Sequence, residues 1–305
     1  MTTRTRAGII ITMTVMPLFL LATGSGGARE IVVDDDGGPW ADHTAIQDAV
    51  NVSQDGDIVR VFAGQYDAAV ILNRAVGLVG NGTKATFLTC TDPTASAIDP
   101  VIDIASDDVD MSDLSIVFGR YLINSFRLVG VRCEARDGLE VVGCDLIVQH
   151  RYDSGIGIVI GNCSRALMVD CTFMNNSQGI MAMNVSLELE GCTFEDEGDA
   201  TFEGSGVNLE GCTFNSESDA FIKNSSMPLI RGCSFGADSR LNIADSIGSR
   251  IEECNFSDSG GSALGLHRAD SSAIENCRFG KASGGMSQYQ SSESRVVRFG
   301  WMLDL

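Results

Sequence analysis

The sequence predicts an all-β protein: a right-handed parallel β-helix solenoid of roughly ten coils with a short N-terminal capping helix. Three observations predict this fold. A six-residue phrase recurs every 20–23 residues, each copy contains a turn-forming residue, and the helical hydrophobic period is absent. A fixed period of this length is typical of stacked supersecondary units, each of which covers the hydrophobic face of its neighbour.

Each copy of the phrase runs apolar, exposed-type, turn-forming, Cys, polar, Phe. The cysteines of the six full copies are Cys171, Cys192, Cys212, Cys233, Cys254 and Cys277. Degraded copies precede them at Val141–Leu146 and Met111–Ile116. The residue before Cys is Gly, Asp, Asn or, once, Glu, and the first three tolerate positive φ.

Cys and Phe are two positions apart, so on a strand both side chains face the same way. The apolar residue three before Cys can face inward as well only if the chain bends between them. Each copy therefore predicts a strand, a tight bend and a second strand. A third short strand follows, as in Gly179–Met183 and Ala220–Ile222. Three strands per coil with the usual right-handed crossover give the β-helix.

The six cysteines are predicted to form a buried, mostly reduced column beside a column of phenylalanines. Stacked strands lie about 4.8 Å apart, whereas disulfide-bonded Cβ atoms lie about 3.8 Å apart with a demanding dihedral angle. A buried thiol packs as a small apolar group. Cys90, Cys133 and Cys163 lie outside the column, and their redox state stays open.

Residues 1–28 have the pattern of a secretory signal peptide. Arg4 and Arg6 precede an apolar run from Ala7 to Ala22, and small residues follow as far as Ala28. A retained membrane anchor is the alternative. No other run of about 18 apolar residues follows, so no later transmembrane segment is expected. The signal predicts a secreted or cell-surface protein, extracellular or periplasmic.

The β-helix is expected to span residues 29–280, and residues 281–305 to form an irregular tail or cap. The first coil of a solenoid exposes its core, so it needs a cover. A short helix running through Val52, capped by Asp42 or Thr44, is the candidate.

Four opening segments carry a family resemblance: Thr44–Ala49, Asp55–Val61, Gly64–Tyr66 and Val79–Gly82. They resemble the start of secreted pectin-lyase-like β-helix proteins, in particular surface proteins with NosD-type or CASH-type (carbohydrate-binding and sugar-hydrolysis) repeats. The resemblance implies a β-helix that acts at a cell surface on carbohydrate.

The formal net charge of −20 disfavours nucleic acid as a partner, because such a surface repels polyanions. It suits cation binding, or simple solubility.

Two charged columns are expected in the turn that follows the Phe position. Three residues after Phe stand Glu197, Glu217 and Asp238; five residues after it stand Asp199, Asp219 and Arg240. The same two positions in flanking turns hold Asn176, Gln178, Ser259 and Gly261.

Paired carboxylates at this spacing could act as acid and base in sugar cleavage, which makes Asp199, Asp219 and Arg240 catalytic candidates. Glu197, Asp199, Glu217, Asp219 and Asp238 could instead bind Ca²⁺. Acids that extend into water are the third reading.

The same turn is longer in the two preceding coils, and insertions in a solenoid often mark the binding face. The inserted residues suited to sugar stacking and carboxylate contacts are Arg120, Tyr121, His150, Arg151 and Tyr152. An ordinary surface loop is the alternative.

These features predict a secreted or cell-surface β-helix that binds glycan or envelope material without catalysis. A polysaccharide lyase or glycoside hydrolase is one alternative, and a purely structural envelope protein is another. The segment Phe214–Lys223 distantly resembles the polygalacturonase segment with paired aspartates, but the second adjacent Asp is missing and no Gly-His-Gly or Arg-Ile-Lys follows. Fold alone does not decide among these functions.

Overall fold

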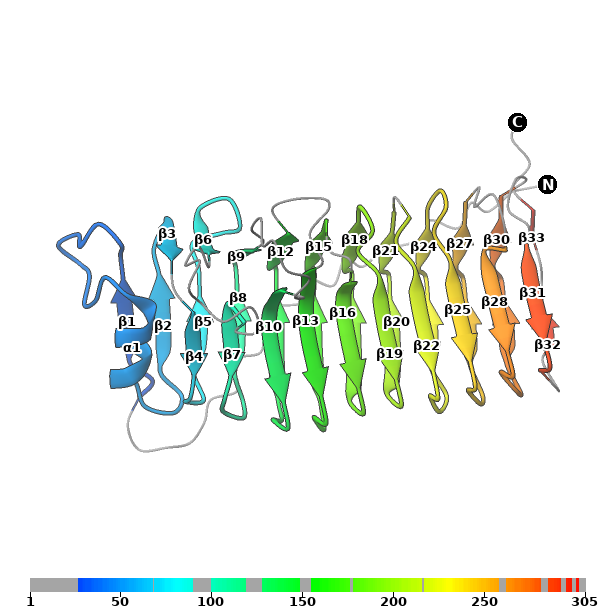
Figure 1. The fold of residues 1–305 in the computed structure, drawn as a ribbon, viewed down its shortest axis with the longest axis horizontal. Helices are drawn as coiled ribbons and strands as arrows, with labels where there is room; N and C mark the ends of the chain where they lie inside the picture. Colours follow the sequence, from blue (N-terminus) through cyan, green and yellow to red (C-terminus); the bar gives the residue numbers. More distant parts are fainter. Residues whose placement is uncertain are drawn as a thin grey trace, which may run out of the picture.

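The computed structural model describes residues 27–67, 69–89, 100–118, 128–148, 155–175, 178–215, 217–257, 262–280, 285–291, 295–297 and 300–301. These residues form one elongated stack of short strands, with a short helix at its N-terminal end (Figure 1).

The strands lie in three sheets that run along the stack, and every strand pairs in parallel with its equivalents in the neighbouring coils. Sheet A contains, in order, β1 (Glu30–Val33), β2 (Ile58–Val61), β5 (Gly77–Val79), β8 (Asp110–Ser112), β11 (Leu139–Val142), β14 (Ala166–Val169), β17 (Ser186–Glu190), β20 (Gly206–Glu210), β23 (Leu229–Arg231), β26 (Arg250–Glu252), β29 (Ala273–Glu275) and β32 (Arg295–Val297).

Sheet B contains β3 (Gly64–Asp67), β6 (Thr86–Thr89), β9 (Ser115–Phe118), β12 (Asp145–Val148), β15 (Thr172–Met174), β18 (Thr193–Glu195), β21 (Thr213–Phe214), β24 (Ser234–Phe235), β27 (Asn255–Phe256), β30 (Arg278–Phe279) and β33 (Gly300–Trp301). Sheet C contains β4 (Val70–Leu72), β7 (Ile102–Ile104), β10 (Leu128–Glu134), β13 (Gly155–Gly161), β16 (Gln178–Met183), β19 (Ala200–Glu203), β22 (Ala220–Lys223), β25 (Leu241–Ala244), β28 (Leu264–His267) and β31 (Met286–Tyr289). The predicted solenoid of roughly ten coils with three strands per coil is confirmed.

The predicted bend joins sheet A to sheet B in every full copy of the phrase. The residue before each column cysteine has a φ between 51° and 64°; these residues are Asp170, Gly191, Gly211, Gly232, Glu253 and Asn276. This left-handed conformation turns the chain so that the last inward residue of sheet A and the cysteine both reach the core. Gly and Asn/Asp adopt it readily, as the sequence predicts.

A second left-handed bend, which the sequence analysis did not anticipate, joins sheet C back to sheet A. Its residues have φ values between 50° and 61°, and they include Asn162, Asn184, Gly204, Asn224 and Asp245. Each is followed by a small or medium buried residue: Cys163, Val185, Ser205, Ser225 and Ser246. Two single-residue bends thus close two corners of every such coil, and the longer connection from sheet B to sheet C closes the third.

The core contains two columns of identical side chains, one of Phe and one of Cys. The rings of Phe173, Phe194, Phe214, Phe235, Phe256 and Phe279 stack with centroids 4.5–4.9 Å apart and interplanar angles of 1–12°. Each column cysteine places its Sγ 3.4–3.6 Å from a carbonyl oxygen of the preceding coil. All nine cysteines in the described residues are buried free thiols, which confirms the predicted unpaired column.

Helix α1 (Ile46–Val52) packs at the N-terminal end of the stack and buries its apolar face (Figure 1). The predicted cap is wrong, because the N-cap residue is Ala45, which makes no side-chain capping bond. Asp42 instead accepts a hydrogen bond from the backbone N–H of Val32 in β1 (2.9 Å).

The helix also covers the free edge of sheet C. The Gln47 side-chain oxygen accepts the N–H of Ile71 (2.7 Å), and its amide nitrogen donates to the carbonyl of Ile71 (3.2 Å). One amide side chain thereby satisfies the β4 backbone groups that would otherwise pair with another strand. An unpaired strand edge invites pairing with other chains, so this bond protects the end of the stack.

The C-terminal stretch 281–305, expected to form an irregular tail or cap, contains three strands in its described residues. Strands β31, β32 and β33 pair with β28, β29 and β30 and so add a further coil. The register places Val296 beside Ile274 and Trp301 beside Phe279. In this coil the repeated phrase has Trp in place of Phe and lacks the cysteine. The Cys and Phe pattern therefore does not predict this coil.

We expect Phe214→Ala to lower the free energy of unfolding by about 3–5 kcal/mol, as large-to-small core substitutions do. The Phe214 side chain is fully buried between the rings of Phe194 and Phe235. Urea titration measures the loss, and Phe221→Ala, which removes a ring on the outer surface, is the matched control. A loss for Phe214→Ala no larger than that of the control would contradict the register.

Candidate functional site

The outer face of sheet C carries the most exposed aromatic ring among its central strands. Phe221 in β22 is 37% exposed, whereas Phe202 on the adjacent strand β19 points inward and is fully buried. The register aligns Phe221 with Thr201 on one side and Asn242 on the other. Strands β19, β22 and β25 lie side by side along the stack (Figure 1). An apolar ring therefore stands between two hydrogen-bonding side chains on a continuous parallel sheet.

The Phe221 ring lines an open hollow of about 310 Å³. The hollow is lined by Thr201, Glu203, Phe221, Ile222, Lys223, Asn242 and Ala244. On its far side Glu203 and Lys223 form an ion pair (3.5 Å), and Glu203 also accepts a hydrogen bond from the Asn224 amide (3.2 Å). The hollow thus combines one apolar platform with amide, hydroxyl and paired charged groups.

The predicted column of Asp199, Asp219 and Arg240 lies at the edge of sheet C where its strands begin. These residues immediately precede β19, β22 and β25. Asp199 Oδ1 accepts the backbone N–H of Asp219 (2.8 Å), and Asp219 Oδ1 accepts the backbone N–H of Arg240 (2.7 Å). Each aspartate therefore ties its turn to the next coil, a structural role that the sequence analysis did not anticipate.

Burial raises the pKa of Asp199 to about 6, and the negative charges of Asp219 and Glu197 add to this rise. The hydrogen bond from the Asp219 backbone acts in the opposite direction. Burial also raises the pKa of Asp219, while the Arg240 backbone bond and charge favour its ionised form. The two acids are thus held in an environment that disfavours full ionisation.

The outer column Glu197, Glu217 and Asp238 occupies the turn apices. All three are exposed and have φ values of 60–69°, so they serve as left-handed turn residues. Within the described ranges no three His, Cys, Asp or Glu side chains are grouped to hold a metal ion. The Ca²⁺ site at these acids stays a hypothesis.

One member of the inner column is displaced. Ile180, which pairs with Ala200, lies seven residues after Phe173, whereas Ala200, Ala220 and Leu241 each lie six residues after the Phe of their own coil. Gly179, not Gln178, therefore lies opposite Asp199. Gln178 instead donates from its amide to the Thr201 hydroxyl (3.3 Å), at the rim of the hollow.

The other predicted ligand-binding residues, Arg120, Tyr121, His150, Arg151 and Tyr152, lie outside the described residues. Their segments connect β9 to β10 and β12 to β13. Each is a connection from sheet B to sheet C, as are the turns that contain Asp199 and Asp219.

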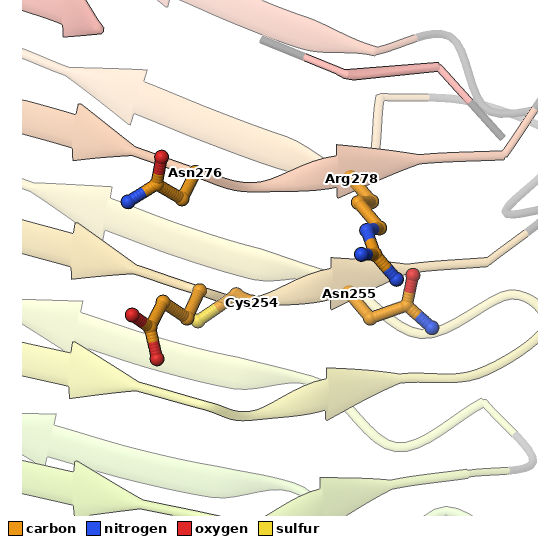
Figure 2. A pocket seen from close by; sticks show the side chains of 5 residues that line it. Cys254, Asn255, Asn276 and Arg278 are labelled. Carbon is orange, nitrogen blue, oxygen red and sulfur yellow. The ribbon is translucent and has the colours of Figure 1, made fainter. Parts of the chain in front are cut away.

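A second hollow, of about 340 Å³, lies at the bend between sheets A and B. Figure 2 shows Asn276 on one side of it and Asn255 and Arg278 on the other, with Cys254 between. The buried Oδ1 of Asn255 has no hydrogen-bond partner within the described structure. This hollow has no aromatic platform, so we place the candidate site on sheet C.

The three parallel sheets of this stack place the chain in the class of right-handed parallel β-helix proteins. The chain belongs to the family described as the right-handed β-helix region, whose profile matches residues 122–235 and 157–299. No curated protein sequence matches it.

Solved structures share the fold at low identity. The Dettilon tailspike protein is 10% identical with a TM-score of 0.50, and the match covers 84% of this chain and 57% of that one. Carrot pectin methylesterase is 12% identical with a TM-score of 0.49, covering 91% and 90%. The ORF18 protein of Geobacillus virus E2 is 15% identical with a TM-score of 0.48, covering 83% and 57%. The chain thus spans just over half the length of the two viral proteins, and at these identities the likeness concerns the fold alone.

We expect Asp199→Asn to change how stability depends on pH. Burial raises the pKa of folded Asp199 to about 6, above the ordinary value of 3.8, so the contribution of Asp199 to the stability of the wild type is lost as the pH rises from 3.8 to about 6. Asn keeps an oxygen for the Asp219 N–H but does not ionise. The stability of the variant relative to wild type should therefore rise across this window in urea titrations at several pH values.

The matched control for this prediction is Glu217→Gln, which removes a carboxylate from the exposed apex of the next turn. It should follow the wild-type curve, because exposed charges contribute little to stability. A difference in the free energy of unfolding between Asp199→Asn and wild type that stays constant from pH 3.8 to 7 would contradict the raised pKa of Asp199.

Proposed function

We propose that this protein binds glycan through the outer face of sheet C, at Phe221 and the polar side chains around it, without catalysing a reaction. The observation that carries the proposal is the exposed Phe221 ring at the centre of a sheet whose neighbouring positions hold Thr201 and Asn242. Binding sites commonly combine an aromatic surface with a few placed polar groups.

A sugar ring matches this arrangement chemically. Its C–H face is apolar and fits against an aromatic ring, while its hydroxyl groups both donate and accept hydrogen bonds. Thr201 and Asn242 can do both as well, and Glu203 accepts while Lys223 donates. The stack extends beyond the hollow in both directions, so a linear glycan could lie across several coils.

Binding without catalysis fits the state of the two acids. A glycosidase needs one carboxyl group at the leaving oxygen and another at the nucleophile position. In this chain Asp199 Oδ1 and Asp219 Oδ1 are already engaged with backbone N–H groups of the next coil. The raised pKa of Asp199, about 6, is the observation that favours the hydrolase or lyase alternative, because it suits a general acid.

The proposal also includes the segments that carry Arg120, Tyr121, Arg151 and Tyr152. In the chain path they connect sheet B to sheet C, as the turns with Asp199 and Asp219 do.

Residues 1–28 support a further part of the proposal: secretion or display at the cell surface, where envelope glycan is the available ligand. No helix in the described part of the chain is long and apolar enough to cross a membrane.

A glycan array followed by calorimetric titration of the strongest ligand tests the proposal. Phe221→Ala should weaken binding by about tenfold, since an aromatic contact contributes about 1 kcal/mol or more beyond its buried area. Ile71→Ala is the matched control: it also removes an exposed apolar side chain from sheet C, but near the N-terminal end.

Failure of any glycan to bind would favour the purely structural alternative. Equal affinity of Phe221→Ala and wild type for the glycan would show that Phe221 is not part of the binding site. Release of reducing sugar or unsaturated uronate from a bound polymer would show that the protein is an enzyme.

A further inference from the structure

Two cysteines outside the thiol column lie side by side. The Sγ atoms of Cys133 and Cys163 are 3.7 Å apart, although the residues are 30 positions apart in sequence. Cys133 is an inward residue of β10, and Cys163 follows the bend after β13 in the next coil. Both are buried, with 0% and 3% exposure.

Cys163 makes the same carbonyl contacts as the column cysteines: its Sγ approaches the carbonyl of Gly161 in its own coil (3.3 Å) and that of Cys133 in the preceding coil (3.7 Å). The contact that sets this pair apart is the one between the two sulfurs. Cys163 lies directly after the exposed Asn162 and before the exposed Ser164, so the pair is one residue below the surface.

We propose that Cys133 and Cys163 are a covalent modification site, at which reaction with a small disulfide oxidant forms a disulfide between consecutive coils while the column cysteines stay reduced. Bond formation brings the two sulfurs from 3.7 Å to about 2.05 Å. The proposal is independent of glycan binding.

The reaction proceeds by two exchanges. The Cys163 thiolate attacks one sulfur of the oxidant, forms a mixed disulfide and releases the first thiolate of the oxidant. Cys133 then loses its proton and attacks the Cys163 sulfur, which breaks the mixed disulfide and releases the second thiolate. Two protein thiols are oxidised, one oxidant disulfide is reduced to two thiols, and their two protons pass to these products.

Cys163 is suited to the first attack. The hydrogen bond from the Cys133 thiol lowers the pKa of Cys163 to about 7, despite its burial. The same interaction, together with burial, raises the pKa of Cys133. Contacts between neighbouring thiols also lower the pKa of Cys212 and Cys254 in the column, so the selectivity rests on the 3.7 Å sulfur–sulfur contact and on the place of Cys163 between two exposed residues. Cys163 is also the more exposed of the two, and both thiolate character and access control the rate of exchange.

The bond would join the two coils whose sheet C strands follow the connections that carry the predicted ligand-binding residues. Strand β10 follows residues 119–127 and β13 follows residues 149–154, the segments with Arg120, Tyr121, Arg151 and Tyr152. An oxidised pair would fix these two coils relative to each other.

The test treats the folded full-length protein with bis(2-hydroxyethyl) disulfide, then denatures it and alkylates the remaining thiols. Mass spectrometry should show a loss of two hydrogen atoms, two fewer alkylated cysteines and a cross-linked peptide containing Cys133 and Cys163. Cys171 and Cys192, neighbours in the column, should remain alkylated and serve as internal controls.

Two variants make the test specific. Cys163→Ser places at this position the residue that later coils already have, Ser205, Ser225 and Ser246, so the fold should be kept. Cys133→Ala matches Ala182, which occupies the same column two coils later. Cys163→Ser should form neither the cross-link nor the mixed disulfide, whereas Cys133→Ala should stop at a mixed disulfide on Cys163. Full alkylation of the oxidised wild type, or a cross-link within the column, would overturn the proposal.

Discussion

The whole structure depends on one backbone constraint: a single residue with positive φ between the last inward side chain of sheet A and the inward cysteine. At this position the chain must turn sharply without a loop. The left-handed conformation does this in one residue, so strand, bend and strand fit into six positions. Because the coils from β8 to β30 turn at the same place, equivalent residues stack along the axis, and the Phe and Cys columns follow. The outward residues are set by the same register, including those around Phe221.

The inward columns and this bend could be predicted from sequence because both repeat at fixed spacing. A search for Cys and Phe still missed the last coil, where Val296 and Trp301 take the repeat positions. The second bend was also missed. The residues that follow it, such as Cys163, Val185 and Ser205, are all small or medium in size but differ in residue type, so they form no recognisable repeat. The helix cap was misassigned because Asp42, a good capping residue, makes its bond to β1 instead.

The candidate site was harder to predict, because its residues are defined by contacts between coils. A phenylalanine such as Phe221 is usually expected in the core. Only the strand register, which pairs Phe221 with Thr201, shows that Phe221 faces outward while Phe202 faces inward. Asp199 and Asp219 stand where the sequence placed them, but their backbone bonds to the next coil cannot be read from spacing. A single extra residue in one turn shifted Gln178 out of the predicted column.

The most direct test of the bend constraint compares Gly211→Asn with Gly211→Val by urea unfolding. An added Cβ at Gly211 meets no atom within 4 Å, so any loss reflects the backbone conformation, with φ at 64°. Asn tolerates this region, as Asn276 does in its own coil, whereas a β-branched residue there is a strained outlier. The account predicts that Val lowers the free energy of unfolding by roughly 1–2 kcal/mol more than Asn does. Equal losses for the two variants would contradict it.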